Sequence, residues 1–207
     1  RAAGIAHFIL VTGRPKAVIE DHFDVQVELE QTLRERGRQE ALAELARDLP
    51  AAGTMSFTRQ QAPLGLGHAV WCARELVGPE PFAVLLPDMV TRGGSRGGRC
   101  LAQCVAAYER HGGNIIAVEE VSPAETHQYG IVGVGDPAGK DAFRITAMVE
   151  KPEPKSAPSN LFINGRYILQ PAVFRQLDRQ ERGAGNEIQL TDAMIAVAKS
   201  EPFYGVR

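Results

Sequence analysis

The sequence has no apolar run long enough to span a bilayer, and no signal peptide can be recognised in it. These absences predict a cytoplasmic protein with no membrane partner. An excess of charge of one sign is also missing, because 23 Lys and Arg residues face 25 Asp and Glu residues and leave a formal net charge of -2. A nucleic-acid partner is therefore not expected, although a nucleotide ligand needs only local basic groups.

Cysteine is scarce, and its number is odd: the chain has only Cys72, Cys100 and Cys104. This count, without the spacing of a disulfide framework, fits reduced thiols in the cytoplasm. Cys100 and Cys104 are expected to share one helix face, where two thiols could bind a metal. Because no other Cys or His lies near them in the sequence, packing is the favoured interpretation.

The rest of the composition is typical of a soluble globular protein, with 207 residues of which 44% are hydrophobic. That length is enough for one α/β domain with a sizeable core. Residues 1–5 resemble the last turn of a helix that stops at Gly4, and residues 202–207 resemble the start of a strand. We therefore expect the chain to be a piece of a longer protein, or to have missing ends.

Hydrophobic periodicity divides the chain into alternating strands and helices, followed by a strand-rich stretch. This order predicts an α/β fold whose mostly parallel mixed sheet is flanked by helices and carries a smaller antiparallel insertion. No linker is visible, so one domain over residues 1–207 is expected. The predicted strands are 7–12, 54–58, 82–86, 114–119, 131–134, 143–149 and 161–169, and the predicted helices are 16–22, 27–49 with a break near Gly37, 69–76, 100–111, 171–177 and 188–198.

Asp88 is the first candidate functional residue, because it ends an apolar run, residues 82–87, that reads as a buried strand. Pro87 cannot donate to a ladder and so marks the end of pairing. Asp88 is therefore expected at the carboxyl edge of the sheet, where open α/β folds bind ligands. From this stretch alone, a metal ligand and a loop residue that caps the next turn are equally good interpretations.

Two further groups of residues could bind a ligand. The segment 59–69 lies between a predicted strand and a helix; Gly65 would let backbone approach a flat ligand, and the amide of Gln60 can match a pyrimidine edge. Glu150 and Lys151 end a predicted strand, and they suit sugar hydroxyls and a phosphate respectively. The alternatives are a simple tight turn and a surface ion pair.

Glycine marks two more positions, Gly130 beside Tyr129 and Gly165 inside a predicted strand. A glycine in a strand allows a ligand to approach the backbone, and the alternative is bulge geometry. The Gly- and Arg-rich segment 91–99 is predicted to be a mobile loop whose arginines could touch phosphate, although a solvated loop tip is the favoured interpretation.

Seven segments in order resemble the bacterial UTP–glucose-1-phosphate uridylyltransferases. The resemblance covers essentially the whole chain, and the order of the motifs is more specific than any one of them. The helical segment 20–45 and the last motif favour this family over the glucose-1-phosphate thymidylyltransferases. The segments are LVTGRPKAVIEDHFD, RQQAPLGLGHAV, LLPDMV, QYGIVGVG, VEKP, APSNLFINGRYIL and GAGNEIQLTDA.

The resemblance implies a Rossmann-like nucleotidyltransferase fold, a homo-oligomer, and the joining of UTP and glucose 1-phosphate into UDP-glucose and pyrophosphate with Mg²⁺. It implies that Gln60 and Gly65 contact uracil, and that Asp88 binds the metal. It also implies that Lys151 neutralises the sugar phosphate. The glucose would be held by Gly130, Glu150 and the backbone of Ile163, Asn164 and Gly165.

The chain departs from the family pattern at both ends. The family's Gly-rich phosphate loop precedes the first strand seen here, and its second metal-binding Asp follows the last residue, so this chain is expected to be inactive by itself. Leu64 replaces a Lys found in some relatives. The alternatives are a thymidylyltransferase or another sugar-nucleotide pyrophosphorylase, and a non-catalytic nucleotide-sugar-binding fragment.

Overall fold

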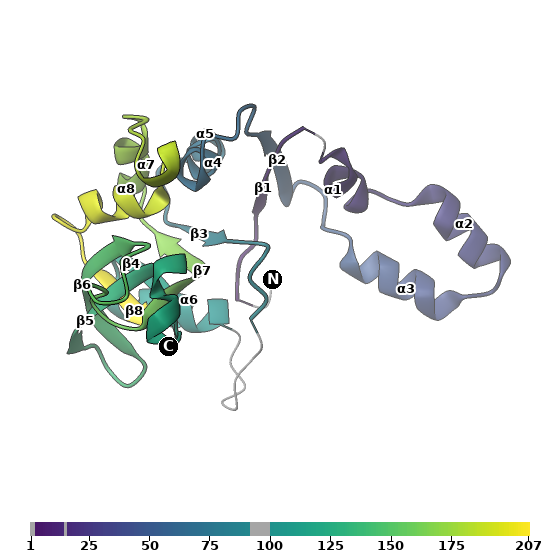
Figure 1. Ribbon diagram of the computed structural model, residues 1–207. Helices are drawn as coiled ribbons and strands as arrows, with labels where there is room; N and C mark the ends of the chain where they lie inside the picture. Colours follow the sequence, from purple (N-terminus) through teal and green to yellow (C-terminus); the bar gives the residue numbers. More distant parts are fainter. Residues whose placement is uncertain (1–2, 15, 92–99) are drawn as a thin grey trace. The chain divides into compact units, whose positions relative to one another are not determined.

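The computed structural model describes residues 3–14, 16–91 and 100–207 of the chain (Figure 1). It contains two compact units, one formed by residues 5–63 and the other by residues 1–4 with 64–207. The Gly- and Arg-rich loop predicted at 91–99 falls, except for Thr91, outside the described residues. The expectation of a single domain stays a prediction.

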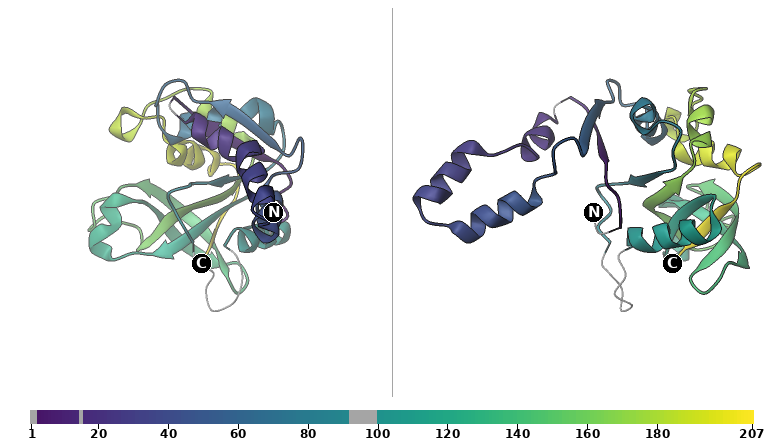
Figure 2. Two further views of the ribbon diagram at one scale, coloured as in Figure 1. Left: turned by 90° about the vertical axis from the view of Figure 1, so that its right-hand side faces the viewer. Right: turned by 180° about the vertical axis from the view of Figure 1, so that it is seen from behind.

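The unit of residues 5–63 has a small parallel sheet and three helices. Strand β1 (Phe8–Thr12) pairs with β2 (Met55–Arg59), and Thr12 lies opposite Arg59. Between them come α1 (Ala17–His22), α2 (Val27–Glu35) and α3 (Gln39–Asp48), and the last two form a hairpin that Figure 2 shows side by side. The predicted break is confirmed at Gly37, whose φ of 63° is readily adopted only by glycine.

The larger unit is built on a six-stranded sheet in the order β3-β7-β4-β8-β6-β5. Strand β5 also pairs with β7, through Ile131 and Phe162, so that β7, β4, β8, β6 and β5 close into a small mixed barrel with β3 at its side. The strands are β3 (Phe82–Leu85), β4 (Asn114–Glu120), β5 (Gly130–Pro137), β6 (Ala142–Glu150), β7 (Leu161–Leu169) and β8 (Phe203–Val206).

The expectation of a mostly parallel sheet is wrong for the described strands. Only β1–β2 and β4–β8 pair in parallel, whereas β3–β7, β4–β7, β5–β6, β5–β7 and β6–β8 are antiparallel. That expectation rested on the alternation of strands and helices along the sequence. The order of elements does not decide which strands become neighbours, and in the larger unit β7 lies between β3 and β4 and is antiparallel to both.

Two hydrophobic cores lie on opposite faces of β7 and β4. One core joins them to α4 (Leu66–Trp71), α7 (Ala172–Leu177) and α8 (Leu190–Val197), and the other joins them to α6 (Cys100–His111). Along β7, Tyr167 and Leu169 face the first core and Ile168 faces the second. Because side chains alternate along a strand, successive side chains of β7 pack against different sets of helices.

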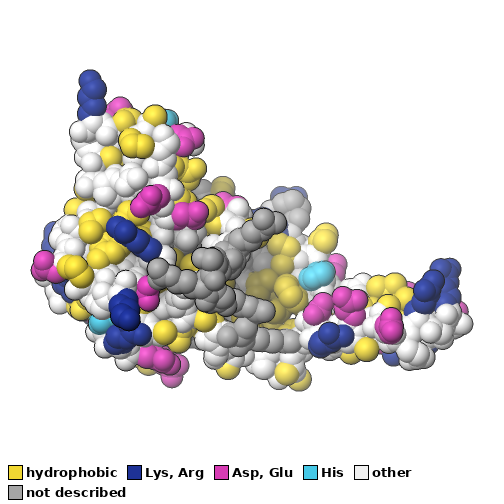
Figure 3. Space-filling view, turned by 90° about the horizontal axis from the view of Figure 1, so that it is seen from below, with side chains coloured by type: hydrophobic (Ala, Val, Ile, Leu, Met, Phe, Trp, Pro, Cys, Tyr) yellow, Lys and Arg dark blue, Asp and Glu magenta, His cyan; other side chains and the backbone are white. Residues whose placement is uncertain are grey.

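The predicted elements are otherwise found within a few residues of their expected positions. The helix predicted at 69–76 is two short helices, α4 and α5 (Arg74–Val77), and two 3₁₀ turns, η1 (Pro123–Gln128) and η2 (Ala184–Asn186), were not predicted. Within the described part of the chain, no helix has both the length and the apolar composition that crossing a membrane requires. On the face drawn in Figure 3, acidic and basic side chains are interspersed among the described residues.

Gly205 should be essential to the packing of the barrel. It lies opposite Phe143 on the neighbouring strand, and a Cβ at this position would come within 2.3 Å of the Phe143 ring. Gly205→Ala should therefore lower the free energy of unfolding by about 1–3 kcal/mol, the usual cost of overpacking, as measured by urea denaturation. Gly13→Ala, whose Cβ would meet no atom closer than 3.4 Å, is the control and should change stability little.

Candidate functional site

Arg166 anchors the turn that carries Asp88 to β7. Its guanidinium donates hydrogen bonds to the carbonyl oxygens of Leu86, at 2.9 Å, and Met89, which bracket Asp88 in the sequence. The Leu86 amide in turn donates to the Gly165 carbonyl oxygen at 3.0 Å. The exposed carboxylate of Asp88 therefore stands on a turn that is held from three backbone positions, directly after β3 and Pro87 as the sequence predicted.

Gly165 lets the two segments come close together. Its φ is 78°, and a Cβ there would lie 3.0 Å from the Leu86 Cβ. The sequence offered two interpretations of this glycine, ligand approach and bulge geometry. In the structure, the space that a side chain would need is taken by Leu86, so local backbone geometry alone requires glycine here.

Gly130, Glu150 and Ile163 meet at one end of the barrel. Gly130 is the register partner of Glu150, and a Cβ at residue 130 would lie 3.1 Å from Glu150 Oε2 and 3.2 Å from Ile163 Cδ1. The half-buried Glu150 carboxylate accepts a hydrogen bond of 2.8 Å from the Thr191 hydroxyl in the first turn of α8. Three predicted site residues from three strands are thus neighbours.

Lys151 adopts a backbone conformation that is unusual for its residue type. Its φ is 47°, and its amide donates to the Tyr129 carbonyl oxygen at 3.0 Å, which fixes the turn at the end of β6. A non-glycine residue in the left-handed region is uncommon, and such residues are concentrated at functional sites. Lys151 is exposed and directly follows Glu150 in the chain.

The buried Tyr167 lies within electrostatic reach of both candidate carboxylates. Burial raises the pKa of its phenol most, the Glu150 and Asp88 carboxylates raise it further, and the Arg166 guanidinium opposes them. One side chain therefore experiences the charges of the β3 turn and of the β6 end at once. The two candidate groups of the larger unit, anchored separately, face a common region.

The sequence did not identify Tyr167, Arg166 or Thr191 as parts of this arrangement. Tyr167 and Arg166 were only strand residues within a quoted motif, and Thr191 was only one position of another quoted motif. The motif GAGNEIQLTDA was a signal for Thr191, but only the register of β5 and β6 shows that its hydroxyl meets Glu150.

Gly65 and its neighbours form a tight contact with the segment before α8. The φ of Gly65 is 109°, and a Cβ there would lie 2.8 Å from Glu187 Cβ and from the Ile188 carbonyl oxygen. The amide of Gly67 donates to that same oxygen at 2.8 Å, and the Ile188 amide donates to the Leu64 carbonyl oxygen at 2.7 Å. This close approach of backbone to backbone explains the glycines.

Gln60 belongs to the other unit, directly after β2. Its amide donates to the Thr12 carbonyl oxygen at 2.8 Å and so extends the pairing of β1 and β2 by one residue. Its half-buried side chain therefore follows the carboxyl end of a parallel strand pair. This is the position in an α/β sheet that usually contacts a ligand.

Asn164 turns away from these residues and toward α6. It is 5% exposed, its Nδ2 donates to Cys100 Sγ at 4.0 Å, and its Oδ1 has no hydrogen-bond partner in the described part of the protein. Its side chain therefore lies on the opposite face of β7 from Tyr167. Only its backbone is available on the side of Glu150 and Ile163.

No cluster of three or more metal-ligating side chains occurs among residues 3–14, 16–91 and 100–207. Asp88 nonetheless suits Mg²⁺, because this hard cation binds oxygen and commonly takes only one or two protein carboxylates beside substrate phosphates and water. Its exposed carboxylate on an anchored turn meets that requirement.

Comparisons with known proteins identify the family of the chain. The family model described as nucleotidyl transferase matches residues 17–205. The chain belongs to the nucleotidyl transferase family. It is 44% identical over its whole length to a UTP–glucose-1-phosphate uridylyltransferase of Komagataeibacter xylinus, of which it covers 72%. By this homology, the transferase has the activity of a UDP-glucose pyrophosphorylase.

Solved structures give the same assignment. A UTP-bound UDP-glucose pyrophosphorylase from Acinetobacter baumannii is 38% identical, with a TM-score of 0.87 over 99% of this chain and 70% of that one. A UDP-glucose pyrophosphorylase complexed with UDP-glucose is 33% identical, with a TM-score of 0.82 over 97% and 72% of the two chains. The transferase chain thus spans about 70% of the length of these solved relatives.

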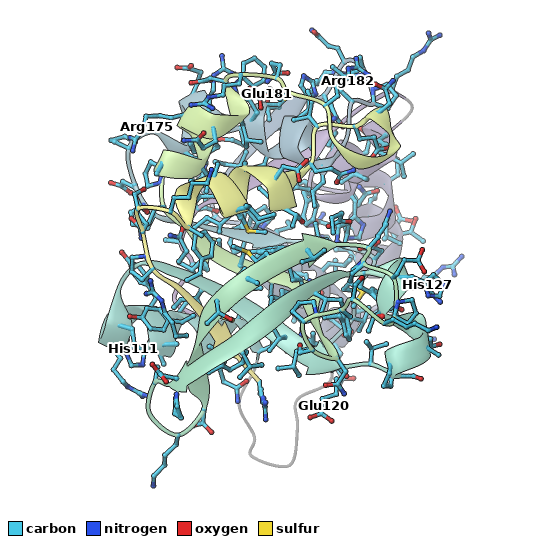
Figure 4. All side chains as sticks on the ribbon, turned by 60° about the vertical axis from the view of Figure 1, so that its left-hand side comes forward. His111, Glu120, His127, Arg175, Glu181 and Arg182 are labelled. Carbon is cyan, nitrogen blue, oxygen red and sulfur yellow. The ribbon has the colours of Figure 1, made fainter. Side chains whose placement is uncertain are left out.

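Replacing Arg166 should loosen the Asp88 turn. In Arg166→Met, the carbonyl oxygens of Leu86 and Met89 lose their donor, and the stability should fall by about 1–3 kcal/mol. Amide hydrogen exchange at Leu86 should accelerate, since its bond to Gly165 depends on the same turn. Arg175→Met, at an exposed position of α7 labelled in Figure 4, is the control and should leave both measurements unchanged.

Proposed function

We propose that the protein transfers a uridylyl group from UTP to glucose 1-phosphate, with the sugar held at the end of the barrel and the metal at Asp88. Gly130, Glu150 and the backbone of Ile163, Asn164 and Gly165 hold the glucose. Lys151 contacts its phosphate, and Gln60 and Gly65 contact the uracil. UTP, glucose 1-phosphate and UDP-glucose are then the small-molecule partners.

The meeting of Gly130, Glu150 and Ile163 carries this proposal. A half-buried carboxylate beside a glycine offers two acceptor oxygens to vicinal hydroxyls and leaves room for a sugar ring against the backbone. The hydrogen bond from Thr191 fixes one oxygen of that carboxylate, so its orientation is set before the sugar arrives. Thr191 is thus a positioning residue in this proposal.

The reaction requires that the two substrates be aligned and that the charge of their phosphates be neutralised. A phosphate oxygen of glucose 1-phosphate attacks the α-phosphorus of UTP, a new P–O bond forms, and pyrophosphate leaves from the opposite side. No protein nucleophile is needed, so no Ser, Cys or His is assigned a chemical role. Lys151 is exposed and directly follows Glu150 in the chain, and its ammonium offsets the charge of the attacking phosphate.

The exposed carboxylate of Asp88 is the proposed Mg²⁺ ligand. Bound there, the ion supplies positive charge to the triphosphate. Arg166 contributes indirectly, because it holds the turn in place while its own donors are occupied by backbone carbonyls. The charges of both carboxylates act on Tyr167, whose raised pKa favours the neutral phenol.

The assay that tests the function compares nucleotides. The full-length protein is given glucose 1-phosphate and Mg²⁺ with UTP or dTTP, and pyrophosphate release is measured. Turnover with UTP should exceed turnover with dTTP; the reverse order would make the protein a thymidylyltransferase, and binding of UDP-glucose without turnover would make it a binding module. The three cysteines, none of which forms a disulfide, fit the proposed cytoplasmic location, and a homo-oligomer stays a prediction.

Asp88→Asn should keep the fold and remove most of the turnover. The amide has no negative charge for a divalent cation, and losing such an electrostatic contact costs roughly a hundredfold or more in kcat. UDP-glucose synthesis and the melting temperature are measured together. Asp136→Asn, an exposed position of β5, is the matched control, and a near-normal rate in Asp88→Asn would remove this residue from the metal site.

Lys151→Ala should mainly weaken the use of the sugar phosphate. Loss of a charge-assisted contact worth about 1.5 kcal/mol should raise the KM for glucose 1-phosphate by roughly tenfold. The KM for UTP should change less. Lys155→Ala, four residues further on and also exposed, should behave like the unmodified protein; equal kinetics for the two variants would refute the assignment.

A further inference from the structure

Two thiols lie at the start of α6, and the first of them contacts the side chain of Asn164. Cys100 is half-buried, and Cys104, one helical turn further along α6, is 0% exposed. Cys100 also lines a cavity of about 870 Å³, together with Gln103, Glu119 and Asn164. One thiol is therefore open to a small reagent, and the other lies beneath it.

The surroundings of Cys100 favour negative charge on its sulfur. The S–H of Cys104 and the Nδ2 of Asn164, the latter at 4.0 Å, both donate toward it, and the Arg166 guanidinium adds positive charge. Burial and the Glu119 carboxylate act in the opposite direction. Asn164 is itself 5% exposed and its Oδ1 lacks a partner among the described residues, so a polar acceptor also lies beside this cavity.

These groups shift the pKa values of the two thiols in opposite directions. The hydrogen bond from Cys104 lowers the pKa of Cys100 most, to about 6, while donation of that bond and burial raise the pKa of Cys104. Cys100 is therefore the more acidic of the two thiols. A thiolate that is accessible and has a protonated cysteine as its neighbour is the usual environment of an oxidation-sensitive cysteine.

We propose that Cys100 is a modification site that reacts with peroxides and small electrophiles. With hydrogen peroxide, the thiolate sulfur forms an S–O bond, the O–O bond breaks, and hydroxide leaves and is protonated, so the sulfur is oxidised to a sulfenic acid and the peroxide is reduced to water. With iodoacetamide, an S–C bond forms and iodide leaves with the electron pair. Cys104 supplies the hydrogen bond and does not itself react.

Modification at this position acts on the substrate site through β7. An adduct on Cys100 occupies the space beside Asn164. It also removes the negative charge of the Cys100 sulfur, which interacts with the Arg166 guanidinium. Arg166 holds the turn of Asp88, and Ile163, which precedes Asn164, contacts the Gly130–Glu150 position. This step rests on the proposed function; the reactivity of the thiol does not.

The reactivity is tested by alkylation of the full chain with iodoacetamide, followed by peptide mass spectrometry between pH 5 and 9. Cys72 is the internal control, because burial raises its pKa. Cys100 should be alkylated about tenfold faster than Cys72 at pH 6, and its rate should level off above pH 7 while that of Cys72 still rises. A Cys100 rate that keeps rising between pH 8 and 9, or labelling of Cys72 first at pH 6, would overturn the proposal.

Two substitutions test the role of Cys104. Cys104→Ser keeps a donor and should preserve the low midpoint of the Cys100 profile, whereas Cys104→Ala removes the donor and should move the midpoint upward. Equal profiles in the two variants would contradict the assigned hydrogen bond. Circular dichroism of each variant checks that α6 remains folded.

The effect on catalysis is a separate measurement. The full-length protein and Cys100→Ser are treated with iodoacetamide or hydrogen peroxide at pH 6 and assayed for UDP-glucose synthesis. The unmodified sequence should lose activity by tenfold or more, and Cys100→Ser should resist. Full activity of a protein alkylated at Cys100 would refute the coupling through β7, whereas failure of the proposed function would appear as no synthesis before treatment, with the alkylation profile unchanged.

Discussion

The hydrogen bonds from Arg166 to the turn after β3 determine how the rest of the larger unit is arranged. Without them, a turn that contains proline, and so has one fewer amide donor, would be attached to β7 only through the Leu86 amide. With them, the position of the Asp88 turn relative to the end of β3 is fixed. A guanidinium suits this task because its donors form a rigid fork that can reach two carbonyl oxygens at once.

Strand β7 carries this arrangement because it pairs with β3, β4 and β5. Its alternating residues serve different purposes: Ile163 and Tyr167 face the two candidate carboxylates, while Asn164 faces α6. Gly165, in the left-handed region, lies between these positions and admits Leu86. A single strand thus links the turn of Asp88, the carboxylate of Glu150 and the thiol pair.

Much of this could be predicted from the sequence, because hydrophobic runs and glycine breaks are local signals. Asp88 after a buried strand, the break at Gly37 and the helix from Cys100 to His111 follow directly from them. The pairing of Gly130 with Glu150 could not be predicted, since the β5–β6 register shifts beside Gly133 and only tertiary packing decides where. Strand direction was mispredicted for a related reason, because only tertiary packing places β7 between β3 and β4.

The backbone contact between Gly65 and the segment before α8 means that a substitution at Gly65 acts on more than its own loop. Ile188 is bonded to Leu64 and Gly67, and Thr191, three residues later, holds the carboxylate of Glu150. A side chain added at Gly65 would push on residues 187 and 188 and displace the beginning of α8. Under the proposed function, a kinetic defect in such a variant would therefore combine a changed contact at Gly65 with a displaced Glu150 carboxylate, and the affinities for both substrates would fall together.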